Sequence, residues 1–162
     1  MHIGTSQLWL AGALSLLLII ASVTDWQRRE IDNWLNATVA LAAPLFWLAT
    51  GLDPWPGMAI QFATGVGVFA LFAVFFAINA MGGGDFKLLV ALGLWFPPLT
   101  MLHLILIMSI MGGFLTVFML IRQKRLKLEG KPEIPYGIAI TFAGLWVIYE
   151  RYINHFPSLI AV

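Results

Sequence analysis

Asp25 and Asp85 lie where apolar stretches of the sequence meet polar ones, and they are the first candidates for chemistry. Asp25 ends the first apolar stretch and Asp85 opens the fourth, so two membrane crossings between them would return both to one face. Ionisable residues at such positions in an apolar protein are candidate functional groups. Two carboxylates held close together share a proton, because both cannot ionise easily. Such a pair can hydrolyse a peptide bond by general acid–base catalysis, one carboxylate accepting a proton from water while the other donates to the carbonyl oxygen.

Three glycines, Gly82, Gly83 and Gly84, come directly before Asp85. Without a Cβ atom, such a backbone can adopt positive φ and allows another chain to approach closely. The run is not a phosphate-binding loop, because no Gly-Lys-Ser/Thr sequence follows it. Glycine before a helix is also an ordinary turn signal, so the tripeptide alone does not identify a site.

The composition indicates which elements must position these residues. Of the 162 residues, 60% are hydrophobic and only 10% are charged, and the mean hydropathy is +0.90. A soluble domain has about 45–50% apolar and roughly 25% charged residues. We therefore expect a single all-α membrane domain over residues 1–162 and exclude a soluble globule, a disordered tail and a nucleic-acid-binding protein. The chain has no cysteine and no His-Glu-x-x-His sequence, which argues against a thiol nucleophile and a zinc protease.

A bilayer core about 30 Å thick requires roughly 20 apolar residues per helix. By this measure we expect a polytopic protein with six transmembrane segments, at residues 7–24, 34–50, 59–80, 86–96, 98–121 and 135–153. The fourth segment has only 11 residues and is followed by Pro97 and Pro98, so it is too short to cross alone. Irregular backbone is tolerated at membrane depth only where protein covers it or a wet cavity borders it. We therefore predict that residues 82–85 lie in a water-accessible pocket, unless the helix continues through the prolines with a kink.

The positive charges give a consistent orientation. Eight of the nine Lys and Arg residues fall in the first, third and fifth loops, whereas the second and fourth loops contain none. The positive-inside rule makes the face with these charges cytoplasmic and places both termini outside. Arg151 is the exception, and its long side chain can extend outward from the end of the last segment. We interpret the basic stretch 122–133 as an orientation determinant that contacts anionic lipid headgroups.

Four motifs, the stretch 25–33, Gly82-x-Gly84-Asp85, Phe86-Lys87-Leu88 and Ile134-Pro135-Tyr136-Gly137, occur in this order and together resemble one family, the type IV prepilin peptidases. The stretch 25–33 resembles the family's first block, an aspartate followed six residues later by Ile-Pro-Asn, although Asp32 here replaces the proline. Gly82-x-Gly84-Asp85 resembles the Gly-x-Gly-Asp signature of intramembrane-type aspartyl proteases. The other two motifs are Phe86-Lys87-Leu88, similar to the residues after the second aspartate, and Ile134-Pro135-Tyr136-Gly137, similar to the Pro-Tyr-Gly segment that opens the last helix.

The resemblance implies an aspartyl endopeptidase of the bacterial inner membrane, with Asp25 and Asp85 as the catalytic pair and no cofactor or metal. The substrate would be a prepilin, whose basic leader precedes a long apolar helix and is cut after a glycine at the cytoplasmic face. The chain resembles the short, peptidase-only branch associated with Tad/Flp-type pili, so N-methyltransferase activity is not expected. The residues expected to shape the site or bind substrate are Gly82, Gly83, Gly84, Arg29, Asn33, Lys87, Pro135, Tyr136 and Gly137. Neither the oligomeric state nor the aspartate that starts as the base follows from the sequence.

Several roles have alternatives. Asp25 and Asp85 can instead be helix caps or interfacial charges paired with Arg29 and Lys87, and these two cations can either tune the aspartates or only orient the chain. Asn33 either bonds near Asp25 or, together with Asp32, caps the second helix.

Other polar residues also allow two interpretations. Tyr136 and Gly137 either border the site or only lie at the interface. We interpret His103 as a neutral side chain bonded to a neighbouring helix. Asn79 is either a polar contact between helices, which we favour, or a residue of the site.

Two other functions remain possible for the whole chain. One is a different two-aspartate protease that acts on lipoprotein signal peptides or within transmembrane helices. The Pro-Tyr-Gly segment and the spacing from Asp25 to Asn33 argue against it. The other is a small transporter or assembly scaffold that uses the aspartates as ion or proton ligands.

Overall fold

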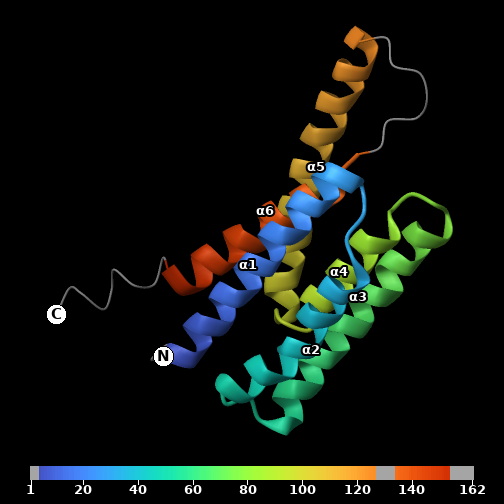
Figure 1. Ribbon diagram of the computed structural model, residues 1–162. Coiled ribbons are helices and arrows are strands. Elements are labelled where there is room, and N and C mark those ends of the chain that lie inside the picture. The colour runs from blue at the N-terminus through green and yellow to red at the C-terminus, as the bar shows by residue number, and fades with distance from the viewer. Residues whose placement is uncertain (1–3, 127–133, 154–162) are drawn as a thin grey trace.

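The computed structural model describes residues 4–126 and 134–153, which form helices and no β-strand (Figure 1). In this part of the chain the α-helices are α1 (Thr5–Arg28), α2 (Asn33–Ala49), α3 (Ala59–Ala77), α4 (Gly83–Gly93), α5 (Pro98–Leu126) and α6 (Tyr136–Ile148). Two short helical turns, η1 (Pro54–Met58) and η2 (Tyr149–Ile153), precede α3 and follow α6. The six helices follow the order of the six predicted segments, which confirms the prediction of an all-α fold.

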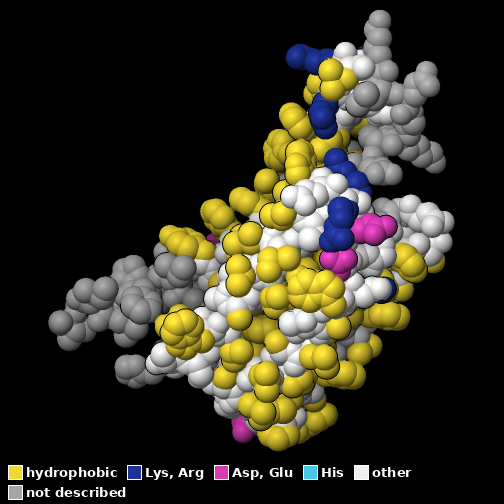
Figure 2. Space-filling view, viewed as in Figure 1, with side chains coloured by type: hydrophobic (Ala, Val, Ile, Leu, Met, Phe, Trp, Pro, Cys, Tyr) yellow, Lys and Arg dark blue, Asp and Glu magenta, His cyan; other side chains and the backbone are white. Residues whose placement is uncertain are grey.

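The surface and the helix lengths are those of an integral membrane protein. Three helices are long and apolar enough to cross a bilayer: α1, α3 together with η1, and α5. The other described helices are shorter, with 17 residues in α2, 11 in α4 and 13 in α6. Apolar side chains cover much of the visible face in Figure 2. Such a continuous apolar surface fits lipid tails rather than water.

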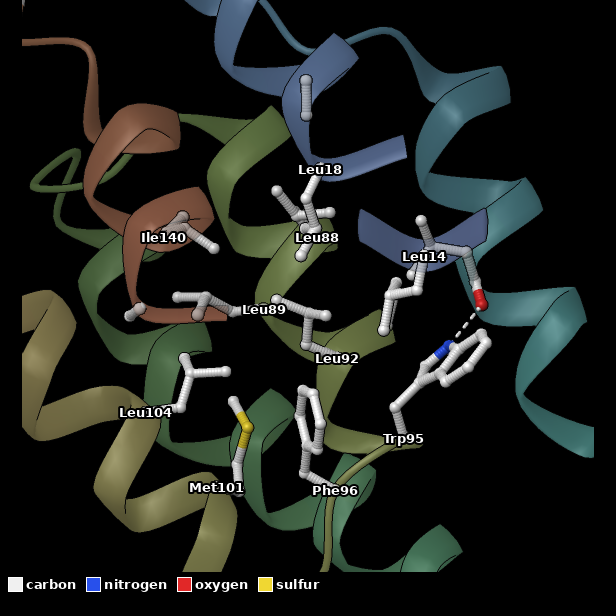
Figure 3. Close-up of a cluster of buried hydrophobic side chains, with 14 of the residues drawn as sticks. Leu14, Leu18, Leu88, Leu89, Leu92, Trp95, Phe96, Met101, Leu104 and Ile140 are labelled. Atoms are coloured by element: carbon white, nitrogen blue, oxygen red, sulfur yellow. Dashed lines mark hydrogen bonds between the residues drawn. The ribbon is translucent and has the colours of Figure 1, made fainter. Parts of the chain in front are cut away.

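The short helix α4 lies at the centre of the molecule. It packs mainly against α2 and α3 and also contacts α5 and α6, while α6 packs against both α1 and α5. Leu88, Leu89 and Leu92 of α4 are fully buried. In Figure 3 they lie among Leu14 and Leu18 of α1, Met101 and Leu104 of α5 and Ile140 of α6. Because lipid tails are as apolar as leucine, close packing rather than exclusion from water holds such a helix in place.

Side chains from neighbouring helices satisfy the backbone at the carboxyl end of α4. Trp47 of α2 donates from Nε1 to the Leu94 carbonyl at 2.7 Å, and Gln61 of α3 donates from Nε2 to the Trp95 carbonyl at 3.0 Å. The Trp95 indole in turn donates to the Val39 carbonyl of α2 at 2.8 Å, the dashed line in Figure 3. Backbone groups that leave a helix at membrane depth require such partners. These bonds explain how α4 can end after 11 residues inside the protein, instead of continuing through the prolines.

The glycines before Asp85 adopt ordinary extended and helical backbone conformations. Gly82 precedes α4 in an extended conformation with φ −66°, and Gly83 and Gly84 are the first two residues of the helix. The non-glycine residues with positive φ are Arg29, at 58°, and Asn79, at 55°. The glycines before Asp85 therefore do not use the positive φ that glycine permits, whereas the expected close approach of another chain occurs at Gly84.

The segments that carry the four motifs meet at one end of the bundle. There α1 ends, α4 begins, α5 ends and α6 begins, at the upper end in Figure 1. Lys and Arg side chains gather at this end in Figure 2. Helix α5 continues to Leu126, so Arg122, Lys124 and Arg125 belong to the helix rather than to a loop. The predicted loop residues Lys127 and Lys131, like both chain ends, lie outside the described residues.

Candidate functional site

Asp25 and Asp85 line the same pocket. Asp25 lies in the last turn of α1 and Asp85 in the first turn of α4. Their side chains are only 4% and 7% exposed, and they are close enough for their charges to interact. The pocket has a volume of about 530 Å³. We call this cavity the aspartate pocket. Its walls are formed by Asp25, Arg28, Arg29, Glu30, Asn79, Ala80, Met81, Gly82, Asp85, Ile134 and Tyr136.

The amino end of α6 holds Asp25. The main-chain N–H of Gly137 donates to Oδ2 of Asp25 at 2.8 Å. A Cβ atom on Gly137 would lie 2.8 Å from that oxygen and 3.0 Å from Cγ of Asp25, so only glycine fits here. A carboxylate at the amino end of a helix is also favoured by the helix dipole. Asp25 is therefore fixed by a direct bond to the Pro-Tyr-Gly segment.

Pro135 and Tyr136 place the amino end of α6 beside the pocket. Pro135 is fully buried and is the residue before the helix. Tyr136 lines the aspartate pocket, and its hydroxyl lies 3.4 Å from Oγ1 of Thr116 on α5. Of these two residues, Tyr136 therefore lines the pocket, and Gly137 contacts it through its bond to Asp25.

The loop after α1 packs on the first turn of α4 and so positions Asp85. A Cβ atom on Gly84 would lie 3.0 Å from both the backbone nitrogen and Cβ of Ile31. Asn36 of α2 donates from Nδ2 to the Gly84 carbonyl at 3.3 Å. Within the described residues, Oδ1 of Asp85 is buried and has no hydrogen-bond partner. One carboxylate oxygen of Asp85 is thus left unpaired by the protein.

Of the two cations expected near the aspartates, Arg29 lines the pocket and Lys87 does not. Lys87 donates from Nζ to Oδ1 of Asn33 at 2.7 Å and does not line the pocket. Arg29 does line it and interacts electrostatically with Asp25. Among the described residues, neither Asp25 nor Asp85 forms an ion pair within 4 Å. The alternative in which Arg29 and Lys87 pair with the two aspartates is therefore not supported by an ion pair.

Asn33 follows neither of its two expected alternatives. The residue that precedes α2 is Asp32, whose side chain makes no capping bond to the helix and instead accepts from Arg28 at 2.6 Å. Asn33 is the first residue of the helix and accepts a hydrogen bond from Lys87. Lys87 and Asn33 therefore connect α4 to α2 beside the pocket rather than inside it.

Two asparagines, Asn79 and Asn36, lie near the aspartates. Asn79 lies in the turn after α3 and lines the pocket, as in the second of its two alternatives rather than the one we favoured. Asn36 was not considered, although a polar residue inside an apolar segment is a signal for an interhelical bond. His103 lies outside the pocket, and its Nδ1 is 3.6 Å from Oε2 of Glu150 in η2, beyond hydrogen-bonding distance.

The geometry favours acid–base chemistry. No group of three or more His, Cys, Asp or Glu side chains that could hold a metal ion occurs in residues 4–126 and 134–153. The aspartate pocket instead offers two buried carboxyl groups, the guanidinium groups of Arg28 and Arg29, and a helix amino end. A water molecule between two such carboxyl groups can be deprotonated by one while the other protonates a carbonyl oxygen.

Comparison with known proteins gives a consistent set of matches. Residues 12–117 match the sequence model of the "Type IV leader peptidase family". A protein of Stutzerimonas stutzeri named "Prepilin leader peptidase/N-methyltransferase" is 33% identical over 163 residues, which cover 90% of this chain and 51% of that protein. A protein of Pseudomonas aeruginosa with the same name is 34% identical over 156 residues, covering 86% of this chain and 49% of that protein.

The matches cover only part of the length of the relatives. The chain spans about half the length of the curated relatives it matches. The region matched by the family model includes both aspartates and ends before Gly137. No solved structure matches the chain.

Proposed function

Because this chain belongs to the type IV leader peptidase family, we propose that it is a membrane aspartyl endopeptidase that removes prepilin leader peptides. The catalytic pair is Asp25 and Asp85. The single observation that carries this proposal is that both buried carboxyl groups line one pocket, although they come from two different helices. We further propose that its substrates are prepilins of the Tad/Flp type.

The two aspartates take different parts in the reaction. Burial disfavours the charged form of both aspartates, but Asp25 accepts the N–H of Gly137 and lies beside Arg29, which offset this cost, whereas Asp85 has the charge of Asp25 beside it. Asp25 is therefore the base that removes a proton from water, whose oxygen attacks the scissile carbonyl carbon. Asp85 is the acid that donates a proton to the carbonyl oxygen. The tetrahedral intermediate then collapses: the C–N bond breaks, the departing amine takes up the proton held by Asp25, and a hydroxyl group of the intermediate returns a proton to Asp85.

The substrate reaches the pair from the membrane. Its apolar segment lies in the bilayer and its basic leader at the cytoplasmic face, which we propose is the end where Arg28, Arg29 and the basic end of α5 lie. Both termini of the enzyme are then outside the inner membrane. A peptide bond inside a helix is already hydrogen-bonded and shielded, so the cleaved segment must be extended when it enters the aspartate pocket.

We propose that the residues described here support cleavage without methylation. The sequence contains no cysteine, whereas the resemblance associates methylation with a region of cysteine pairs. Mass spectrometry of the mature pilin would test this: we expect an unmodified amino terminus, and an added methyl group would contradict the proposal.

Co-expression with a panel of Tad/Flp-type prepilins tests the function. We expect the wild-type chain to cleave at least one of them, and Asp25→Asn and Asp85→Asn each to abolish cleavage. Asp53→Asn is the matched control, because Asp53 is exposed and precedes η1 at the other end of the bundle. Normal maturation in either pocket variant would refute the assignment. A transporter would instead give aspartate-dependent uptake and no cleaved product.

A further inference from the structure

Arg29 turns back over the end of α1. It follows the last residue of the helix with a left-handed backbone, φ 58°, and its N–H donates to the Asp25 carbonyl at 2.9 Å. Its guanidinium group lies over the Trp26 ring, 5.4 Å from the ring centre. The tight turn thus brings the cation next to Asp25 and to the wall of the aspartate pocket.

The guanidinium group of Arg29 has an unused donor. Within the described residues, Nη1 of Arg29 is buried and has no hydrogen-bond partner. Oδ1 of Asp85, on the wall of the same pocket, is also buried and unpaired. A buried polar group without a partner costs free energy, and the cost is larger for a charged group. Two such groups at one pocket indicate a ligand that pairs with both.

We propose that Arg29 binds the scissile carbonyl oxygen and stabilises the negative charge that develops on it during water attack. This inference rests on the proposed peptidase function. A carbonyl oxygen can accept one hydrogen bond from Nη1 of Arg29 and one from the protonated carboxyl group of Asp85, which pairs both unused groups at once. A fixed cationic donor acts most strongly where charge appears in the transition state, in a site shielded from water.

The test removes this donor without straining the backbone. Because φ at residue 29 is positive, Arg29→Gly suits the local conformation, and Arg29→Lys keeps the charge but loses the planar guanidinium group. The purified full chain in lipid vesicles is given a Tad/Flp-type prepilin that the wild type cleaves, and kcat and KM are measured separately. Arg122→Gln is the control, because it removes one charge from the same end of the bundle, on the exposed surface of α5.

We expect Arg29→Gly to lower kcat by about 10²–10³-fold, the usual cost of losing one donor to a developing oxyanion, with a far smaller change in KM. Added guanidinium ion should restore part of the lost kcat in Arg29→Gly and none in Asp85→Asn. Arg29→Lys should also have a lower kcat than the wild type. This variant therefore tests the role of Arg29 even if Arg29→Gly does not fold. Arg122→Gln should match the wild type.

The outcomes separate this inference from the proposed function. A wild-type chain that cleaves no prepilin contradicts the function itself. If the wild type cleaves, an unchanged kcat in Arg29→Gly or Arg29→Lys overturns the role of Arg29 alone. A folded Arg29→Gly variant whose lost activity guanidinium does not restore also overturns it, because that result indicates a structural role only.

Discussion

The main-chain N–H of Gly137 donates to Oδ2 of Asp25 at 2.8 Å, although the two residues are 112 positions apart in the sequence. The bond joins the end of the first helix to the start of the last one. It also explains a glycine at this position, because a Cβ atom would collide with the carboxylate it serves. The amino end of α6 is therefore part of the site that carries the aspartate pair.

Gly137→Ala should displace the Asp25 carboxylate and slow cleavage by about 10²-fold, the effect expected from a shift of about 1 Å at a catalytic group. The reason is that the new Cβ would lie 2.8 Å from Oδ2 of Asp25. The measurement is the initial rate of prepilin cleavage by purified protein. Gly113→Ala on α5 is the control, because a Cβ there has nothing within 4 Å, and equal rates in the two variants would contradict the account.

Gly84→Ala should destabilise the folded protein by roughly 1–3 kcal/mol, the range for overpacking. Its Cβ would lie 3.0 Å from the backbone nitrogen of Ile31, which cannot move as freely as the end of a side chain. Gly83→Ala should be nearly neutral, because its nearest neighbour is the Phe76 ring at 3.4 Å. Unfolding in detergent, followed by loss of helical signal, compares the two; equal stability would show that Gly84 is not a point of close approach.

Trp47→Phe should destabilise the protein by roughly 1–3 kcal/mol, because it leaves the Leu94 carbonyl beyond the end of α4 without its donor. The same unfolding experiment measures this change. Trp55→Phe serves as the control, since Trp55 is 81% exposed in η1. If Trp47→Phe were as stable as the wild type, our explanation of how α4 ends would lose its support.

Single-cysteine labelling can test the orientation, because the chain has no cysteine of its own. Met81→Cys, on the wall of the aspartate pocket, should react with an impermeant maleimide only after the inner membrane is opened. Trp55→Cys, at the opposite end, should react in intact spheroplasts, and Leu88→Cys, fully buried in α4, should react in neither state. Labelling of Met81→Cys in intact spheroplasts would reverse the proposed orientation.

The sequence was sufficient for the parts of the fold that follow from composition and local pattern. Apolar stretches and the charges around them predicted six helices in the right order, and the positions of Asp25 and Asp85 at stretch ends predicted that both lie at one end of the bundle. Each of these inferences needs only the local hydropathy and whether the number of membrane crossings between two residues is even or odd.

The remaining features depend on contacts between distant residues. The start of α4 at Gly83 rather than at Phe86, and its end at Gly93, depend on bonds from Asn36 and Trp47. No local pattern in the sequence specifies these bonds. The glycines before Asp85 illustrate the same point, since an approach of Ile31, and not positive φ, explains the lack of a side chain at Gly84.

The central claim is that Asp25 and Asp85 together cleave a peptide bond. The most direct measurement is the intact mass of a purified prepilin after incubation with purified enzyme in lipid vesicles, comparing wild type, Asp25→Asn, Asp85→Asn and Asp53→Asn. We predict loss of the leader with the wild type and Asp53→Asn, and a rate at least about 10²-fold lower in both pocket variants, because each loses one acid–base group. A near-normal rate with either Asp25→Asn or Asp85→Asn would contradict the account.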